Sequence, residues 1–419
     1  MSGMNFLERL LDGAAVEWKP LGALGEFVRG SGLQKSDFTD SGIGCIHYGQ
    51  IYTFYGDYAY QTKSFVSATL ATKLRKAQKS DLIIATTSEN IEDVCKTLVW
   101  LGEEEVCVSG ETYIFKHSQN PKYLAYYLKT PHFFDFKKRN RTGTKVIRVH
   151  GDRLATFQIP IPCPDNPEKS LAIQAEIVRI LDTFTVLTAE LTAELTAELT
   201  DRQKQYDYYR DRLLTFEEGE VEWKTLGEVA IKISSGGTPK TGVSEYYDGD
   251  IPWLRTQEVD FGEIWDTGVK ITEAGLKNSS AKWMPENCVI LAMYGATVGK
   301  IGINKIAMTT NQACANIQLD ENVANYRYVF HFLSCQYEYI KSLGTGSQTN
   351  INAGIVKKLQ IPIPSLEEQA RIVAILDKFD TLTHSISEGL PREIALRQNQ
   401  YEYHRDLLLT FPKPKEIEA

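Results

Sequence analysis

The sequence has no run of about 18 apolar residues, the length that a membrane-spanning helix requires. It also does not open with the basic, apolar and small-residue regions of a secretory signal peptide. We therefore expect a cytoplasmic protein without a membrane partner. With 419 residues and 42% hydrophobic content, the chain is long enough for about two to four domains with buried cores.

Cysteine pairs at metal-binding spacing are also missing. The chain has seven cysteines, an odd number, and no two of them form a CxxC pair. This pattern excludes the usual zinc motifs and a disulfide framework. We expect buried, free thiols in a reducing compartment and no metal site.

The chain lacks recognisable catalytic and cofactor motifs. It has no NPPY-like or DPPY-like sequence of an amino-methyltransferase, and Gly30-Ser-Gly32 and Gly344-Thr-Gly346 lack the third glycine of a nucleotide fingerprint. The segment 295–300 is one residue short of a P-loop, and Ile301 stands where a magnesium-binding Ser or Thr would be. We interpret all three segments as turns and expect no catalytic or cofactor-binding residue.

An excess of positive charge is absent as well. The net charge is −8, which is the wrong sign for a nucleic-acid-binding protein. Basic residues are nevertheless clustered locally, and such a cluster can neutralise several phosphates or can simply form a solvated face. The stronger cluster comprises Lys137, Lys138, Arg139, Arg141, Lys145, Arg148 and Arg153.

The chain does have a long internal repeat. Residues 174–188, QAEIVRILDTFTVLT, match 369–383, QARIVAILDKFDTLT, and residues 205–216 match 400–411 at the same offset of 195 residues. A duplicated chain predicts two similar frames related by a pseudo-two-fold axis. Such a protein suits a target with two parts.

Shorter phrases extend the repeated frame. Each long block follows Gln-Ile-Pro-Ile-Pro, at 158–162 and 360–364, and each half opens with Val-Glu-Trp-Lys. The inserts between these phrases, residues 28–157 and 231–359, have similar lengths but little identity. A repeated frame around two unlike inserts predicts two different recognition modules, with neutral drift of two structural domains as the alternative.

The repeated blocks predict long amphipathic helices. Ser170 and Ser365 stand where a helix N-cap is expected, and Glu368 would complete a capping box with Ser365. Apolar residues then recur at helical spacing, which predicts a first helix over about 171–214. We expect the two helical regions to pack antiparallel.

Two features distinguish the helical regions. The first contains Thr-Ala-Glu-Leu three times, at 188–199, where a four-residue leucine step turns the stripe by about 40° per repeat. We interpret this ladder as a spacer held helical partly by a partner helix. The second region contains Gly389 and Pro391, which predict a break into two helices.

Together these features resemble the specificity (S) subunits of Type I restriction–modification systems, in the subfamily with TAEL repeats. The resemblance rests on the duplicated IPIP–helix–QY-Y-RD-LLTF frame, the unlike inserts and the TAEL ladder. It implies an α+β fold with two target-recognition domains separated by an antiparallel pair of long helices, the conserved regions of the family. The implied division is 1–162, 163–216, 217–364 and 365–419 as domain, spacer, domain and spacer.

The resemblance also implies the function and the partners. Such a subunit reads a split double-stranded DNA target without catalysis. Two modification (M) subunits carry S-adenosylmethionine and methylate adenine, and restriction (R) subunits use ATP and magnesium. The alternatives are a duplicated coiled-coil scaffold for protein partners, which the acidic net charge would suit, and an enzyme in its own right.

Three polar segments in each insert are candidate DNA contacts, because Asn and Gln pair with adenine, Arg pairs with guanine, and hydroxyl groups bind phosphate. In the first insert the candidates are His47, Tyr48, Gln50, Thr87, Ser88, Asn90, Arg139, Arg141, Thr142 and Lys145. In the second insert they are Arg255, Gln257, Tyr294, Thr297, Thr345, Ser347, Gln348 and Asn350. For each residue the alternative is an ordinary turn position.

Overall fold

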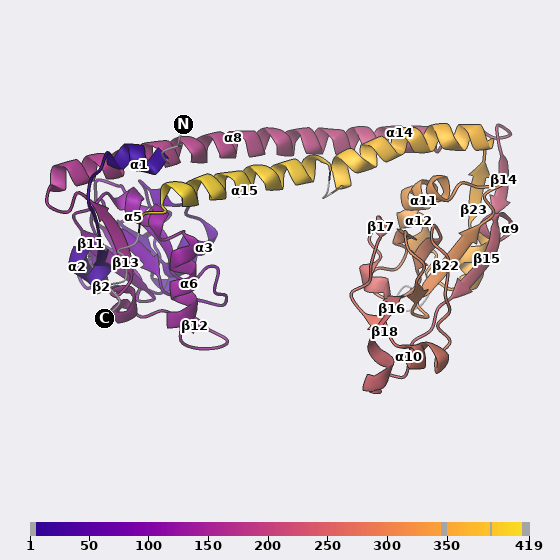
Figure 1. Ribbon diagram of the computed structural model, residues 1–419, viewed down its shortest axis with the longest axis horizontal. Coiled ribbons are helices and arrows are strands. Elements are labelled where there is room, and N and C mark those ends of the chain that lie inside the picture. Colours follow the sequence, from indigo (N-terminus) through magenta and orange to yellow (C-terminus); the bar gives the residue numbers. More distant parts are fainter. Residues whose placement is uncertain (1–5, 345–349, 386–387, 413–419) are drawn as a thin grey trace. The chain divides into compact units, whose positions relative to one another are not determined.

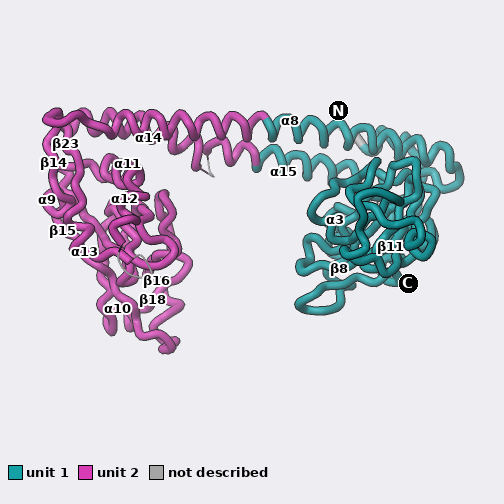
Figure 2. The backbone as a smooth tube through the Cα atoms, turned by 180° about the vertical axis from the view of Figure 1, so that it is seen from behind, with its two compact units in different colours: residues 1–193, 395–419 teal, residues 194–394 magenta. Residues whose placement is uncertain are grey.

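The computed structural model describes residues 6–344, 350–385 and 388–412. The chain divides into two compact units, which Figure 2 colours separately. Unit 1 comprises Met1–Ala193 with Ala395–Ala419, and unit 2 comprises Glu194–Ile394. Both divisions fall inside helices, so each unit holds one insert together with helical segments from both repeats.

The larger sheet of unit 1 has five strands in the order β2–β11–β7–β9–β4. Leu82 and Ile84 of β7 contribute to one hydrophobic cluster, and Ile83 and Ala85 contribute to another. The sheet is therefore covered on both faces, as expected for central strands that are continuous apolar runs. The strands are β2 (Gly25–Arg29), β11 (Thr112–His117), β7 (Leu82–Ala85), β9 (Lys96–Trp100) and β4 (Tyr58–Ala59).

Three smaller sheets complete the strands of unit 1. The four-stranded sheet has the order β5–β3–β10–β6, and β1 pairs with β13 and β8 with β12. The β1–β13 pair joins the Val-Glu-Trp-Lys and Ile-Pro-Ile-Pro phrases in antiparallel register. The strands are β5 (Ser64–Val66), β3 (Ile43–Ile46), β10 (Val106–Val108), β6 (Lys76–Ala77), β1 (Val16–Pro20), β13 (Gln158–Pro162), β8 (Thr87–Ser88) and β12 (Ile147–Arg148).

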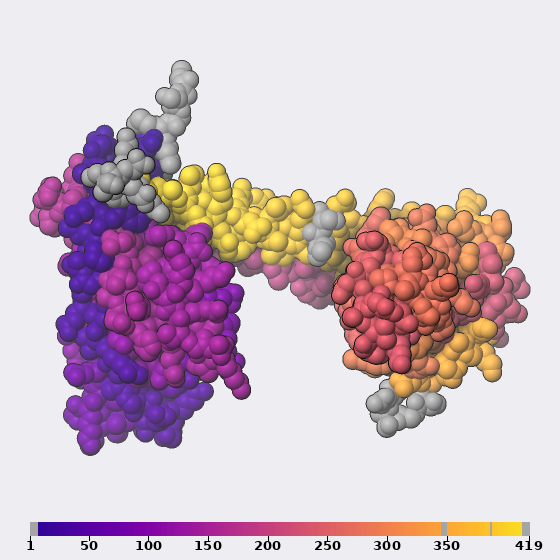
Figure 3. All heavy atoms as spheres, turned by 60° about the horizontal axis from the view of Figure 1, so that its bottom comes forward, coloured from indigo at the N-terminus to yellow at the C-terminus, as the bar shows by residue number. Residues whose placement is uncertain are grey.

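The helices of unit 1 are mostly short. Figure 3 shows the N-terminal part of the chain, in indigo, against the purple and magenta atoms of the later part of the first insert. The helices are α1 (Phe6–Leu11), α2 (Leu21–Leu24), η1 (Lys35–Asp37), α3 (Tyr48–Thr53), α4 (Ala68–Ala71), α5 (Pro121–Tyr127), α6 (Pro131–Asn140) and α7 (Gly151–Leu154), with parts of α8 (Pro167–Leu213) and α15 (Leu390–Leu408).

Unit 2 repeats this arrangement. Its five-stranded sheet has the order β15–β22–β19–β20–β17, its smaller sheet has the order β18–β16–β21, and β14 pairs with β23. The strands are β14 (Glu222–Thr225), β15 (Ala230–Ser235), β16 (Tyr247–Leu254), β17 (Glu263–Ile264), β18 (Lys270–Ile271), β19 (Val289–Ala292), β20 (Ile301–Asn304), β21 (Thr309–Thr310), β22 (Cys314–Leu319) and β23 (Gln360–Ile363). The helices are α9 (Leu226–Val229), η2 (Ser244–Tyr246), η3 (Thr256–Glu258), α10 (Glu273–Lys277), α11 (Tyr326–Cys335), α12 (Tyr337–Ser342), α13 (Ala353–Lys358) and α14 (Leu366–His384), with parts of α8 and α15.

The two unlike inserts therefore share the order of the five-stranded sheet and of three strands of the smaller sheet. Strand β6 and the β8–β12 pair of unit 1 have no counterpart among the described strands of unit 2. In each five-stranded sheet only the outermost pair is parallel, β4 with β9 and β17 with β20. In each smaller sheet one pair is parallel, β3 with β10 and β16 with β21. Strand order depends on where apolar runs and turns fall rather than on residue identity, so similar frames can hold dissimilar sequences.

The first long helix begins earlier than its predicted start. Helix α8 starts at Pro167, and the side chain of Asn166 accepts a hydrogen bond from the Lys169 N–H, 3.0 Å. Ser170 lies inside the helix and accepts a hydrogen bond from Gln174, 3.1 Å, so its predicted role as the N-cap is wrong. Asn is an equally good cap, and the Pro after it suits the first helical position.

The second helical region starts and breaks as expected. Ser365 caps α14 by accepting from the Glu368 N–H, 3.2 Å, although the Glu368 carboxylate pairs with Arg371 at 2.6 Å and does not complete the capping box. Helix α14 ends at His384 and α15 begins at Leu390. A Cβ on Gly389 would lie 2.3 Å from the Thr381 carbonyl oxygen, so only glycine fits at this break.

Within each unit the helices pair antiparallel, and Figure 1 follows α8 beside α15 and α14. In unit 1 the ring of Phe184 lies 5.9 Å from that of His404, and Thr185 hydrogen bonds to Tyr401 at 3.1 Å. In unit 2 the ring of Phe379 stacks 5.6 Å from that of Tyr209. Phe184 and Phe379 are repeat equivalents, so the same contact forms twice.

The TAEL ladder is a regular part of α8, but its leucine stripe is only half covered. Leu187 and Leu191 are 48% and 44% exposed, and Leu195 and Leu199 are intermediate. At the end of the ladder Arg202 pairs with Glu198 at 2.8 Å, which relieves repulsion between the stacked glutamates. The segment therefore keeps apolar surface that neither unit buries.

Candidate nucleic-acid interface

The first candidate segment of unit 1 is the N-terminal turn of α3. His47 Nδ1 accepts from the Gly49 N–H, 3.1 Å, and the His47 N–H donates to Gln50 Oε1, 3.0 Å. Gln50 Nε2 donates to Ser64, 2.7 Å, so the amide of Gln50 is occupied within the protein. Burial, followed by the charge of Lys35, lowers the pKa of His47. Of the three candidates in this segment, His47 and Gln50 are buried, and Tyr48 is half-buried and partly accessible.

The second segment forms β8 and the turn after it. Thr87 is buried and its hydroxyl donates to Glu111 at 2.6 Å, while Ser88 is half-buried. Asn90 is exposed, but its side chain exchanges hydrogen bonds with Asp93 at 2.8 and 2.7 Å. Thr87 and Asn90 therefore have structural partners, and Asn90 keeps solvent access.

The third segment spans the end of α6 and a hairpin that projects before β12 (Figure 1). Thr142 pairs with Arg148 across this hairpin, and Gly143 has φ 82°. Arg139, Arg141, Thr142 and Lys145 are all exposed. These side chains are the most accessible of the candidates in unit 1.

The basic cluster is smaller than its sequence indicates. Lys137 is 7% exposed and its ammonium donates to the carbonyl oxygens of Glu92, 2.6 Å, and Val94, 3.0 Å. Burial lowers the pKa of Lys137. Arg148 lies 3.7 Å from Glu111. Lys137 is therefore a structural residue and cannot contact phosphate, so at most six of the seven basic residues of the cluster are available to do so.

Unit 1 brings its three segments together. The Tyr52 hydroxyl of α3 lies within hydrogen-bond distance of the carbonyl oxygens of Ala85, 3.1 Å, and Thr87, 2.9 Å. Strand β8 then pairs with β12, with Ser88 opposite Ile147. Residues 47–50, 87–90 and 139–145 thus share one region of the unit, which the sequence alone did not place.

Unit 2 makes the corresponding arrangement. Arg255 precedes η3 and its Nε donates to Glu258 at 3.2 Å, while Gln257 is exposed. The Thr297 hydroxyl donates to the Thr256 carbonyl oxygen at 2.9 Å, which joins the first two segments. Tyr294, beside this contact, is 37% exposed.

Of the third segment of unit 2, the structure describes Gly344 and Asn350. The Ile351 N–H donates to the Met293 carbonyl oxygen at 3.0 Å, which ties the residue after Asn350 to the residue before Tyr294. Asn350 Oδ1 is buried and has no hydrogen-bond partner among the described residues. Thr345, Ser347 and Gln348 lie outside the described residues.

The polar residues that attach each insert to its helices were not among the candidates. In unit 1, Asp182 of α8 accepts from Lys122 at 2.7 Å and from the Tyr126 hydroxyl at 2.8 Å. In unit 2, Asp377 of α14 lies 2.6 Å from Arg327 Nε and 2.7 Å from His331 Nε2. Their signal was present, because both repeated blocks carry an identical Asp inside an apolar pattern.

A second pair of identical polar residues has the same function. Gln174 Oε1 accepts from the Asn120 N–H at 3.0 Å, and Gln369 Oε1 accepts from the Asn325 N–H at 2.8 Å. Both glutamines are 0% exposed. The repeated frame therefore fixes each insert through equivalent buried hydrogen bonds.

Comparison with known proteins identifies the family. The family model described as the Type I restriction modification DNA specificity domain matches twice, over residues 16–201 and 218–396. The chain belongs to this family. It is a Type I specificity subunit, and the subunit itself is non-catalytic.

Several relatives match over nearly their whole length. The chain is 39% identical to the EcoR124I/EcoR124II specificity subunit of Escherichia coli, with 100% of both chains covered. It is 33% identical to the EcoprrI specificity subunit of Escherichia coli, covering 93% of each, and 34% identical to a putative Haemophilus influenzae specificity subunit, covering 97% and 98%.

Solved structures share the fold of this specificity subunit. One, reported on assembly and conformational transition of a Type I system, has a TM-score of 0.64 at 15% identity, covering 94% of this chain and 97% of that chain. The HsdS subunit of Thermoanaerobacter tengcongensis has a TM-score of 0.53 at 16% identity, covering 94% and 95%. Both support the α+β, two-domain organisation.

The segments that resembled nucleotide motifs have structural explanations in this specificity subunit. Residues 296–299 form a turn, and Gly295 and Gly299 both have φ 84°. Gly30-Ser-Gly32 is not the expected turn, because Ser31 bridges Ser109 and a Cβ on Gly30 would lie 2.0 Å from the Ser109 carbonyl oxygen. Of Gly344-Thr-Gly346, only Gly344 lies among the described residues.

The described residues contain neither a membrane-spanning helix nor a metal-binding group. No helix there is long and apolar enough to cross a membrane, and no group of three or more potential ligands could hold a metal ion. All seven cysteines are free, five of them buried and Cys163 and Cys335 intermediate.

Proposed function

We propose that each insert reads one half of a split double-stranded DNA target, with 1–162 and 217–364 as the two recognition domains and 163–216 and 365–419 as the spacer between them. The observation that carries this proposal is the convergence of three polar segments in the first insert, and of the described parts of the corresponding segments in the second, in a specificity subunit. The inserts differ in sequence within a shared sheet order, as two readers of different half-sites would.

Exposure assigns different roles to the candidate residues. Arg139, Arg141, Thr142 and Lys145 are exposed and suit phosphate or base-edge contacts. His47, Gln50 and Thr87 act as positioning residues, since their polar atoms are bonded inside the unit.

In the second insert, Gln257, Tyr294 and Asn350 are the best candidates for base contacts. The first two are exposed, and the buried Asn350 Oδ1 lacks a partner among the described residues. An amide in this state is suited to pairing with adenine. Thr297 joins the first two segments, Arg255 is bonded to Glu258 within its own segment, and Thr345, Ser347 and Gln348 remain candidates.

The helical spacer is proposed to bind two M subunits, which carry S-adenosylmethionine and methylate an adenine in each half-site. R subunits, with ATP and magnesium, would complete the complex in the bacterial cytoplasm, where the DNA is. The three TAEL repeats and the half-exposed leucines of α8 support placement in the TAEL-repeat subfamily and a protein partner on this surface.

A methylation map tests the proposal. When this subunit and its M subunit are expressed in a host, genome-wide mapping should locate methylated adenines in one split sequence. The purified chain with labelled S-adenosylmethionine should transfer nothing until the M subunit is added. Methylation without a split target, or transfer by the lone chain, contradicts the proposal, and equal binding to random and target duplexes would favour the protein scaffold.

A further inference from the structure

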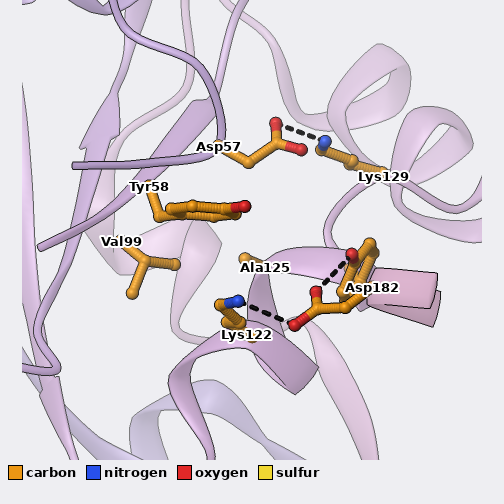
Figure 4. Close-up of a pocket in the computed structure, with 8 residues that line it drawn as sticks. Asp57, Tyr58, Val99, Lys122, Ala125, Lys129 and Asp182 are labelled. Carbon is orange, nitrogen blue, oxygen red and sulfur yellow. Dashed lines mark hydrogen bonds and ion pairs between the residues drawn. The ribbon is translucent and has the colours of Figure 1, made fainter. Parts of the chain in front are cut away.

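Each unit has a cleft beside the segment before the outer parallel strand, the helix that follows the sheet, and the long helices. The two clefts overlap at three equivalent pairs of positions, 57 and 262, 125 and 330, and 129 and 334. In unit 1 this cleft is filled. Asp57, just before β4, forms an ion pair with Lys129, just after α5 (Figure 4). Lys122 lies 4.2 Å from the centre of the Tyr58 ring, and only about 10 Å³ of space is left.

Two equivalences locate the corresponding residues of unit 2. The Asp57 carbonyl oxygen accepts from the Val99 N–H at 2.9 Å, and the Gly262 carbonyl oxygen accepts from the Ile303 N–H at 3.1 Å. Lys129 comes three residues after Tyr126, which binds Asp182, and Ser334 comes three residues after His331, which binds Asp377. The ion pair of unit 1 is therefore replaced by Gly262 and Ser334.

The smaller side chains leave part of the cleft in unit 2 open, and the cleft continues along α8 and α14. It has a volume of about 670 Å³, within the range of ligand sites. The Ser334 hydroxyl is buried and has no hydrogen-bond partner among the described residues. Unit 2 thus has room and an unused polar group where unit 1 has a lysine.

One carboxylate of this cleft can still attract a cation. Asp207, Asp260 and Asp380 line it together with Arg210, and the ammonium groups of Lys300 and Lys341 lie against two of its aromatic walls. Arg210 is already paired with Asp207 at 2.8 Å and with Asp211 at 2.9 Å.

Of these carboxylates, Asp260 is neutralised by Lys300 at 2.6 Å. The only partner of Asp380 among the described residues is His384, at 3.2 Å. A carboxylate without a permanent cation beside it attracts an added positive charge.

The aromatic walls fit the same ligand. Tyr206, Phe261 and Tyr337 line the cleft. Each ring already has a cation of the chain near it: Arg210 at 5.5 Å, Lys300 at 5.8 Å and Lys341 at 5.3 Å from the respective ring centres. A guanidinium or ammonium group is stabilised by such ring faces as well as by carboxylates.

We propose that the cleft of unit 2 binds a guanidinium or ammonium group on an alkyl chain, supplied from outside the chain, at the place where unit 1 supplies Lys129 itself. None of the lining residues belongs to the six candidate segments, so this site is separate from the proposed contacts with DNA. The cation comes from a side chain of a protein partner or from a free small molecule, and the experiment distinguishes these sources.

Ligand binding to the full chain tests the proposal directly. The probe is Nα-acetyl-arginine methylamide, and its uncharged citrulline analogue is the matched control, with binding followed by saturation-transfer NMR. Arginine should bind and citrulline should not. Gly262→Asp with Ser334→Lys, which transplants the ion pair of unit 1, should weaken arginine binding by about tenfold or more, and Asp380→Asn should weaken it without filling the cleft.

The reverse exchange is the second control. Asp57→Gly with Lys129→Ser should create an additional arginine site in unit 1. An unchanged circular dichroism spectrum and an unchanged thermal unfolding midpoint of the filled variant show that it folds, and this control is independent of the proposed DNA function. Equal binding of citrulline, absence of arginine binding, or unchanged arginine binding in both the filled variant and Asp380→Asn overturns the proposal.

Assembly then identifies the source of the cation. If the filled variant binds arginine weakly and also assembles poorly with the M subunit, measured by mass photometry, the cation is a side chain of that subunit. If assembly is unchanged while arginine binding is lost, the ligand is a free cation such as a polyamine. Either result supports a cation site.

Discussion

At the scale of single residues, polar side chains of the same chemical type have different roles in the structure. Gln50 and Asn350 are both amides in candidate segments, but the Gln50 amide is bonded to Ser64 and His47, and Asn350 Oδ1 has no partner among the described residues. Lys137 and Arg141 are four residues apart, yet one is buried and the other exposed. Residue type gives the possible hydrogen bonds, and only the surroundings decide which are already made.

These differences predict the salt dependence of DNA binding. Arg141→Ala should weaken binding and lower the slope of log affinity against log salt by about one unit, because one phosphate contact is lost. The folded Lys137→Ala variant should bind DNA with an unchanged salt slope, since the ammonium of Lys137 bonds to carbonyl oxygens within the protein. The measurement is a salt titration of the complex on target DNA. An unchanged slope for Arg141→Ala would mean that the basic cluster is only a solvated face.

Asp377 should contribute strongly to the stability of unit 2. Burial raises the pKa of its carboxyl, but the hydrogen bonds from His331 and Arg327 and the charge of Arg327 outweigh burial, so the pKa is lowered. Asp377→Asn should cost about 2 kcal/mol near neutral pH, the range for hydrogen bonds to a charged group.

The pH dependence has a definite sign. A carboxyl whose pKa is lowered by folding stabilises the protein fully above its unfolded value, 3.8, and loses that effect as the pH falls through the lower folded value. The difference between Asp377→Asn and wild type should therefore shrink only in acid. Hydrogen exchange in α11 and α14 measures it, with exposed Glu367→Gln as a control expected to change stability by less than about 0.5 kcal/mol.

At the scale of elements, helix ends follow local capping more closely than repeat symmetry. Ser170 and Ser365 are repeat equivalents, but Asn166 caps α8 and leaves Ser170 inside it. Helix α8 could extend towards its N-terminus because Pro167 and a good cap precede the repeated block, whereas Pro362 and Pro364 precede Ser365 in β23 and the turn.

The cap of α14 gives a prediction at this scale. Ser365→Ala should lower the stability of the first turn of α14 by about 1 kcal/mol, because the Glu368 N–H loses its acceptor. Ser365→Asp keeps an acceptor and should restore protection. Hydrogen exchange of the amides of residues 366–370 is the measurement, and equal protection in Ser365→Ala and wild type would contradict the assignment.

The TAEL ladder should set the distance between the half-sites. Removal of residues 196–199 shortens α8 by about 6 Å and turns the residues after it by about 40°. One base pair of B-DNA advances about 3.4 Å and turns about 34°. The rotation matches one base pair while the translation overshoots, and a domain on the wrong side of the duplex cannot bind.

We therefore expect the two-repeat variant to recognise the same half-sites with a gap one base pair shorter. Methylation-site mapping of this variant is the measurement. An unchanged gap, or changed half-site sequences, would mean that the ladder only fills space.

At the scale of the whole molecule, two unlike inserts with a shared sheet order predict separable recognition. Replacement of residues 28–157 by the matching insert of a relative should change one half of the methylated target and leave the other intact. The physical reason is that each insert is fixed to its helices by its own set of contacts, Asp182 and Gln174 in unit 1 and Asp377 and Gln369 in unit 2. Simultaneous change of both half-sites in a methylation map would disprove this modularity.

Much of the fold could be derived from the sequence because it depends on local or repeated signals. The amphipathic blocks predicted the long helices, Gly389 and Pro391 predicted the break between α14 and α15, and the repeat predicted paired frames. The division of each insert into two sheets with one parallel pair each was not predicted, because parallel pairing joins strands that are distant in the chain.

The sequence by itself determined the family, the duplication and the chemical types of the candidate residues. Only the tertiary structure decided which side chains remain available, since a hydrogen bond such as that from Thr87 to Glu111 joins residues 24 positions apart. It also decided that Gly262 and Ser334 border an open cleft in unit 2, whereas the equivalent Asp57 and Lys129 form an ion pair in unit 1. Composition and periodicity report what a residue can do, whereas packing determines which of its groups are already satisfied and which face empty space.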